Sequence, residues 1–155
     1  MSNESHQYCT FHVDNLFLGI DVQRVQEVIR YQQMTRVPLA PNAIEGLINL
    51  RGQIVTAIDL RCHFGMPARA DEYLPMNVVV RDGENAVSFL VDKIGDVVEV
   101  ENSLFEPPPN TVHPSVRNLI HGTYKLPDRL LLAMDTERVL HEFDSRVNGD
   151  GRVAG

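Results

Sequence analysis

The sequence predicts a mainly β protein of two small halves, in which short strands are joined by tight turns and brief helices. Apolar and polar side chains alternate over short runs, as they do along half-buried strands. Turn-forming pairs such as Asp14-Asn15 and Arg51-Gly52 separate these runs. Because the strands are short and closely spaced, without long helices between them, they favour small β-barrels over a parallel sheet. Two barrels around a shared core would satisfy this pattern.

The strands can be placed from their alternation and from the turns that bound them. We predict strands at residues 8–13, 16–20, 47–50, 54–58, 77–81, 86–91, 122–126 and 130–134, with a further apolar stretch at 94–100. Prolines interrupt the chain at Pro38 and Pro41 after an extended segment, 31–36. Residues 66–75 are polar and carry two prolines, so we interpret them as the connection between the halves.

Three short helices are predicted, each after an aspartate that can cap its first turn. They cover residues 22–29 after Asp21, residues 60–64 after Asp59 and residues 136–143 after Asp135. In the first helix the valines at 22, 25 and 28 recur at helical spacing, and Gly65 closes the second.

The hairpin around Arg51-Gly52 is the most informative stretch of the chain. Gly52 supplies the positive φ that a tight hairpin turn needs. Alternation places Asn49 and Arg51 on one face of the strand and its apolar residues on the other. A guanidinium is therefore presented at the tip of a rigid hairpin, where its planar fork can meet a carboxylate. This pattern is typical of a docking surface; the alternative is an exposed arginine that pairs locally, for example with Asp59.

The two halves resemble weak copies of one another. Residues 54–59 align with 130–135, and residues 18–21 align with 89–92. We therefore expect a single domain at 7–143, composed of repeated halves at about 7–65 and 77–143. Residues 1–6 and 144–155 are expected to be flexible tails.

Composition excludes several classes of function. A net charge of −7 provides no basic footprint for nucleic acid and would be repelled by an anionic membrane surface. No secretory signal opens the sequence, and no apolar run reaches the roughly 20 residues of a membrane span. Cys9 and Cys62 fit a reducing compartment, as small buried side chains or, if they lie close together, as a disulfide. We therefore expect a globular, cytoplasmic protein.

Motifs of enzymes and metal sites are missing from the sequence. The six histidines form no i, i+4 pair and have no zinc-ligand spacing with cysteine. There is no nucleophile elbow, Walker loop or dinucleotide fingerprint. We therefore expect no enzymatic activity, no cofactor and no metal. The rival hypothesis, a small β-barrel enzyme or ligand-binding module, would require a pocket of convergent polar groups.

Several short motifs occur along the chain in a fixed order. They are Val25-Gln26-Glu27-Val28, the Val37-Pro38 segment, Gly46, Asn49-Leu50-Arg51-Gly52 and Ile58-Asp59-Leu60-Arg61. Together they resemble the CheW family, the adaptor proteins that couple bacterial chemoreceptors to the histidine kinase CheA. The resemblance covers about residues 8–143. It implies the fold of that family, two intertwined five-stranded SH3-like β-barrel subdomains with short helices around a shared core.

The resemblance also implies roles for individual residues. The arginine that matches Arg51 helps to engage the cytoplasmic helical hairpin of the receptor, and Asn49 belongs to the same surface. Positions that match Val25 and Glu27 contribute to kinase binding; the alternative is an amphipathic helix with Val25 in the core and Glu27 in solvent. Gly46 would be a flat spot on the kinase-docking surface; the alternative is a bulge or a close backbone approach.

The predicted function is therefore that of a non-catalytic adaptor. One face would bind the regulatory domain of CheA, barrel end to barrel end, and another would bind the receptor tip in a groove that includes Arg51. We expect no direct membrane insertion, a monomer when isolated, and a place at receptor arrays through the partners. The same fold in another pathway, such as surface motility, is the alternative. Pro107-Pro108-Pro109 departs from the family pattern before the last hairpin.

Overall fold

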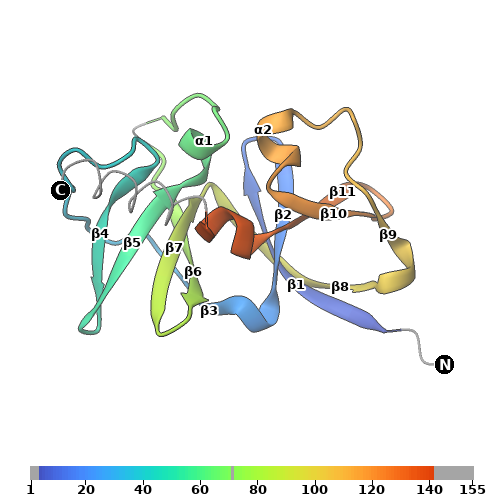
Figure 1. Ribbon diagram of the computed structural model, residues 1–155, viewed down its shortest axis with the longest axis horizontal. Coiled ribbons are helices and arrows are strands. Elements are labelled where there is room, and N and C mark those ends of the chain that lie inside the picture. The colour runs from blue at the N-terminus through green and yellow to red at the C-terminus, as the bar shows by residue number, and fades with distance from the viewer. Residues whose placement is uncertain (1–3, 71, 142–155) are drawn as a thin grey trace.

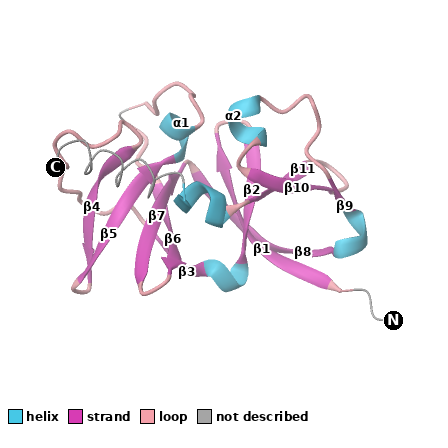
Figure 2. Ribbon diagram, viewed as in Figure 1, coloured by secondary structure: helices cyan, strands magenta, loops and turns pink. Residues whose placement is uncertain are grey.

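The computed structural model describes residues 4–70 and 72–141, and it shows two β-sheets set side by side (Figures 1 and 2). The strands are β1 (Ser5–Val13), β2 (Leu16–Asp21), β3 (Val25–Ile29), β4 (Ile44–Leu50), β5 (Gln53–Asp59), β6 (Met76–Asp82), β7 (Asn85–Val91), β8 (Lys93–Glu101), β9 (Phe105–Glu106), β10 (Ile120–Lys125) and β11 (Leu130–Met134). The helices are η1 (Val22–Arg24), α1 (Leu60–His63), η2 (Asn102–Leu104) and α2 (Pro114–Arg117), and residues 136–141 are also helical.

The larger sheet takes strands from both ends of the chain, and the smaller sheet takes its strands from the part between them, residues 25–91. One sheet has the order β8-β1-β2-β11-β10-β9 and the other has the order β3-β6-β7-β5-β4. Two parallel pairs, β2 with β11 and β5 with β7, join early strands to late ones, whereas the other pairs are antiparallel. The sheets are therefore intertwined, and the mainly β fold class is confirmed. The sixth strand of the larger sheet, β9, has only two residues.

The hairpins β4–β5 and β10–β11 share one irregularity. In the first, Ile44 pairs with Ile58 and Gly46 with Ala57, so that the residue between them, Glu45, is extra. In the second, Ile120 pairs with Met134 and Gly122 with Ala133, which leaves His121 extra. A bulge of this kind bends its strand. Its recurrence at matching places supports the proposal that the two halves are repeats.

The apolar core has a central part that the two sheets share. Phe11 and Leu18 of one sheet meet Val78 and Phe89 of the other in a single cluster. Each sheet also has a smaller cluster of its own, around Val55 in one and around residues such as Leu131 in the other. Since burial of apolar surface is the main favourable term in folding, neither sheet is expected to fold without the other.

The three predicted aspartate caps are confirmed. Asp21 accepts a hydrogen bond from the Gln23 amide at 2.9 Å, and Asp59 accepts one from the Arg61 amide at 3.1 Å. Asp135 accepts one from the Arg138 amide at 3.1 Å, at the start of the helical residues 136–141. The predicted helix end, 142–143, and the tail at 144–155 lie outside the described residues.

The predicted helix at 22–29 is wrong. A single turn, η1, follows Asp21, and the chain then extends as β3. Val25 pairs with Val80 and Val28 with Val78 of β6, with a bulge between Val25 and Glu27. β-branched side chains favour strands when a partner edge is available. The edge of β6 comes from the other half of the chain. Pairing with this edge therefore makes residues 25–29 a strand despite their helical spacing.

Other differences are small. β1 begins at Ser5, which pairs with Glu101, so residues 5 and 6 belong to the sheet and not to a tail. The helix α2 was not predicted, although His113 caps it and Pro114 occupies its first turn, a known starting signal. No helix among the described residues is long and apolar enough to cross a membrane.

Candidate protein-interaction surfaces

The β4–β5 turn presents Arg51 to solvent. Arg51 and Gly52 both have positive φ, 52° and 87°, as the two central residues of a tight hairpin turn require. The Asn49 side chain accepts a hydrogen bond from the Gly52 amide at 2.9 Å, which fixes the turn. The Arg51 side chain is 68% exposed. The structure therefore places both predicted receptor-binding residues at one hairpin tip, where Asn49 holds the turn that displays the guanidinium.

The guanidinium of Arg51 forms an ion pair with Glu27 on β3. The alternative pairing with Asp59 is wrong, because Asp59 caps α1 and contacts Arg69 instead. The hydrogen bond from Arg51 is the main reason that the pKa of Glu27 lies below its usual value. β3 and β4 are the two edge strands of their sheet. The pair therefore links these edges and brings a predicted kinase residue against a predicted receptor residue.

Val25 lies on the same strand as Glu27 but serves the core. It is half-buried and packs against the central cluster, whereas the Glu27 side chain reaches Arg51. The helical alternative for these residues fails with the helix itself, and Glu27, whose side chain is 22% exposed, lies against Arg51 and not free in solvent. Of the two, Glu27 offers a side chain that a partner can reach.

Gly46 is buried where another backbone comes close. Thr35 and Leu47 exchange two backbone hydrogen bonds of 2.8 Å beside it. A Cβ atom at residue 46 would lie 2.8 Å from the Thr35 carbonyl oxygen and 3.0 Å from the Met34 Cβ. Both structural alternatives for this glycine therefore apply, since it follows a bulge and faces a close approach. The Thr35 segment covers Gly46, so Gly46 would affect a docking partner only by setting the position of that segment.

The loop after Thr35 forms an apolar hollow of about 310 Å³ against β4 and β5. Leu39 is fully exposed at φ 65°, and Val37 is also exposed. Exposed apolar side chains around a hollow are typical of a protein-binding surface. The sequence predicted that Pro38 and Pro41 interrupt the chain here, but it did not predict a hollow; the prolines on both sides of Leu39 could have indicated a rigid loop. The hollow is lined by Val37, Pro38, Leu39, Ala40, Pro41, Ile44, Leu47 and Thr56.

A charge network fixes the 66–75 connection to the body of the protein. Arg61 on α1 binds both carboxylate oxygens of Asp92 through its Nε, at 2.9 and 3.0 Å. Arg69 reaches back from the connection to Asp92 at 2.8 Å and to Asp59 at 3.4 Å. The Asp14 amide donates to Asp92 at 2.6 Å. This network could not be predicted from the sequence, because its members come from four separate segments.

The network also explains the electrostatics of Asp92. Burial alone would raise the pKa of its carboxyl, but hydrogen bonds from Arg61, the Asp14 amide and Arg69 outweigh burial and hold the pKa below its usual value.

Cys9 and Cys62 are free thiols and not a disulfide. Among residues 4–70 and 72–141, no group of three or more histidine, cysteine, aspartate or glutamate side chains is arranged to hold a metal ion.

Comparison with known proteins places nearly the whole chain in one family. The family model described as the CheW-like domain matches residues 7–144. The protein is 31% identical over 134 residues to chemotaxis protein CheW of Klebsiella aerogenes, with 86% of this chain and 81% of the relative covered. It is 33% identical over 138 residues to chemotaxis protein CheW of Bacillus subtilis, with 88% and 87% covered.

A solved structure agrees with the fold. The crystal structure of the scaffolding protein TtCheW from Thermoanaerobacter tengcongensis superposes with a TM-score of 0.75 at 26% identity, covering 84% of this chain and 89% of that one. The two sheets described above correspond to the two SH3-like subdomains of that fold, which confirms the predicted fold class. This chain belongs to the CheW-like domain family of chemotaxis proteins.

Proposed function

We propose that this protein is a non-catalytic adaptor that couples chemoreceptors to the histidine kinase CheA. Its family and the names of its relatives, chemotaxis proteins and a scaffolding protein, support this function and do not favour another pathway. The observation that carries the proposal is the exposed Arg51 tip with its Glu27 partner, on the same barrel as a separate apolar hollow. Such an adaptor would work in the cytoplasm as a monomer that joins receptor arrays through its partners.

The receptor surface centres on Arg51. A guanidinium at the tip of a rigid hairpin can bind a glutamate of the receptor hairpin through two hydrogen bonds. In the free protein that guanidinium is already hydrogen-bonded to the Glu27 carboxylate. A receptor carboxylate would therefore have to share Arg51 with Glu27 or replace it, and a displaced Glu27 changes the charge presented along β3. Through this exchange, receptor binding at Arg51 would change the position and charge of Glu27 on β3 of the same barrel.

The kinase surface centres on the hollow around Leu39 and Gly46. The regulatory domain of CheA would dock there barrel end to barrel end, with Leu39 and Val37 as its apolar anchors. An interface of standard size with few anchors is consistent with micromolar affinity, about −8 kcal/mol. The shared core holds both surfaces on one rigid body. A receptor shift can then change how the kinase is held, provided that the contacts differ between the two receptor states.

Arg51→Ala should weaken binding of a receptor tip fragment by about 5- to 150-fold, because a charge-assisted contact contributes roughly 1–3 kcal/mol. Isothermal titration calorimetry with the fragment measures this effect. Arg117→Ala, on α2 of the other barrel, removes an arginine without touching the tip and should bind as wild type does. Equal affinity of Arg51→Ala and wild type for the fragment would show that Arg51 is not the receptor contact.

A further inference from the structure

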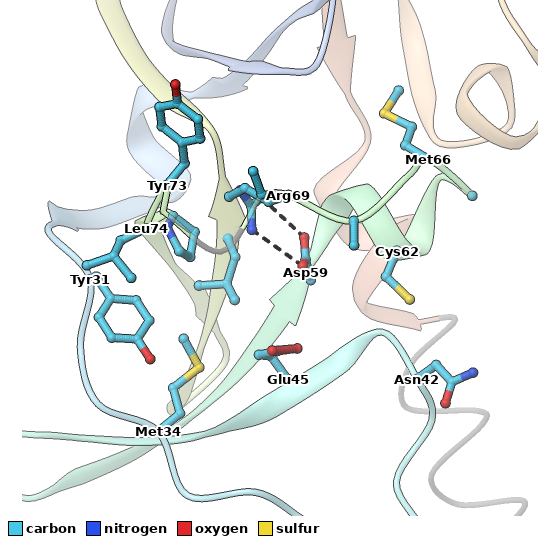
Figure 3. Close-up of a pocket in the computed structure, with 15 residues that line it drawn as sticks. Tyr31, Met34, Asn42, Glu45, Asp59, Cys62, Met66, Arg69, Tyr73 and Leu74 are labelled. Atoms are coloured by element: carbon cyan, nitrogen blue, oxygen red, sulfur yellow. Dashed lines mark hydrogen bonds and ion pairs between the residues drawn. The ribbon is translucent and has the colours of Figure 1, made fainter.

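An open groove of about 630 Å³ lies between residues 66–70 and 73–75 on one side and residues of the chain from Tyr31 to Glu45 on the other (Figure 3). Its floor includes Leu90 and the Asp59–Arg69 ion pair. No described residue lines both this groove and the hollow around Leu39. The groove also lies away from the Arg51 tip, whose residues do not line it. The groove therefore has a lining of its own, although Met34 and Glu45 bring its edge up to Gly46.

The wall of the groove is held in place. The Arg69 side chain is only 10% exposed and is anchored on Asp92 and Asp59, as described above. Arg61 donates to the Pro67 carbonyl at 3.0 Å, and the Tyr73 amide donates to the Ala70 carbonyl at 2.9 Å. A binding surface that is already ordered loses little conformational entropy when a partner arrives. The described residues of the connection, 66–70 and 72–75, are therefore tied to the body of the protein, as a binding wall requires.

The rim of the groove is apolar and exposed. Tyr73 and Leu74 are 67% and 63% exposed, and the exposed Tyr31 lines the same groove. Figure 3 shows these three side chains along one side, with Met34 below them. Exposed large apolar side chains that gather around one hollow are typical of a protein contact. Because the groove is open and not an enclosed cavity, it suits a polypeptide segment better than a small molecule.

The groove carries an excess of negative charge. Glu45, the bulged residue of β4, is exposed and lies between Met34 and the Asp59–Arg69 pair in Figure 3. Within residues 4–70 and 72–141, its side chain has no ion-pair or hydrogen-bond partner. Arg69 is already committed to two carboxylates. Cys62, an exposed thiol, also lines the groove, and its pKa is raised first by partial desolvation and then by the nearby charges of Asp59 and Glu45.

We propose that this groove is a third docking surface, which receives an arginine side chain flanked by apolar residues from a partner polypeptide. The guanidinium would pair with Glu45 and lie against the ring of Tyr31, while the flanking apolar residues cover Tyr73 and Leu74. Arginine suits this site because its planar cation pairs with carboxylates and stacks on aromatic rings. The proposal goes beyond the receptor and kinase roles and does not depend on either of them.

The test uses two blocked peptides, N-acetyl-Leu-Arg-Leu-amide and its analogue with neutral citrulline in place of arginine. Each is titrated into the ¹⁵N-labelled full chain while amide chemical shifts are followed by NMR. Saturable shifts at Glu45, Arg69, Tyr73 and Leu74 are expected for the arginine peptide, with a dissociation constant on the order of 1 mM. The citrulline peptide should bind more weakly, and added salt should weaken only the arginine peptide.

Glu45→Gln removes the charge and keeps the shape of the side chain, so affinity for the arginine peptide should fall about two- to fivefold, as for a partly exposed ion pair. The matched control is Glu84→Gln in the β6–β7 turn, which removes an exposed carboxylate outside the groove and should bind as wild type does. Equal binding of the citrulline and arginine peptides, shifts centred elsewhere, or unchanged affinity in a folded Glu45→Gln variant would each overturn the proposal.

Discussion

Asp92→Ala should lower the free energy of unfolding by about 2–3 kcal/mol, since removing one member of a buried ion pair costs roughly 3–5 kcal/mol and these side chains keep some contact with water. The Asp92 side chain is 19% exposed and binds Arg61, Arg69 and the Asp14 amide. Its loss leaves two largely buried guanidinium groups with fewer partners. Thermal unfolding followed by circular dichroism should show a fall in Tm of roughly 4–12 °C.

The effect of Asp92 should depend on pH in one direction. Its pKa is held below the usual value, so its stabilising contribution is present above the pKa of an unfolded aspartate and is lost as pH falls through the lower folded-state pKa. The difference between wild type and Asp92→Ala should be constant from about pH 5 to about pH 7 and shrink below about pH 4. A difference that instead grows on acidification would contradict the network.

A control separates this network from ordinary surface charge. Asp128 is exposed, and its ion pair is with its neighbour Arg129 at 3.8 Å. Asp128→Ala should change the free energy of unfolding by no more than about 0.5 kcal/mol. If Asp92→Ala and Asp128→Ala unfold alike, Asp92 does not hold the connection in place.

Gly46→Ala should both destabilise the fold, by about 1–3 kcal/mol, and weaken binding to the CheA regulatory domain at least fivefold. The added methyl would meet the Thr35 carbonyl oxygen at 2.8 Å, which is too close, so the Thr35 segment must shift. The exposed Val37 and Leu39 follow this segment directly. Denaturant unfolding measures the first effect, and calorimetry with the kinase domain measures the second.

Gly122→Ala is the matched control for this second prediction. In the corresponding hairpin of the other half, a methyl at residue 122 would lie 2.4 Å from the Glu106 carbonyl oxygen. It should destabilise the protein at least as much as Gly46→Ala while leaving the hollow around Leu39 intact. If both variants lose kinase binding equally, the loss reflects general destabilisation and not the position of the Thr35 segment.

Local signals in the sequence predicted much of the fold. Alternation located the hairpins, and the aspartate caps at Asp21, Asp59 and Asp135 were found because capping depends on neighbouring residues only. The helix at 22–29 failed because its fate depends on β6, which lies far along the chain. Pairing with the edge of β6 stabilises a strand more than the spacing of the valines favours a helix. The spacing of residues contains no information about that pairing.

The features of the candidate sites likewise divide into those that depend on neighbouring residues, which the sequence predicts, and those that depend on distant segments, which it does not. Arg51 at a hairpin tip followed from the turn and from alternation, both of which are local. The Arg51–Glu27 pair could not be predicted, because it depends on how β3 approaches β4. Gly46 could be assigned a bulge or a close approach, but the backbone that approaches, Thr35, became known only with the structure. The Asp92 network was missed entirely because four separate segments converge there.

The central claim is that one rigid protein binds kinase and receptor through different surfaces, and calorimetric titration of both partners tests it most directly. The full chain would be titrated with the CheA regulatory domain and with a receptor tip fragment of the same organism, as wild type, Arg51→Ala and Leu39→Asp. Leu39 is fully exposed, so Leu39→Asp should fold normally. We expect wild type to bind both partners, Arg51→Ala to weaken only the receptor, and Leu39→Asp to weaken only the kinase. Failure of the wild-type protein to bind either partner at high micromolar concentration would contradict the adaptor function.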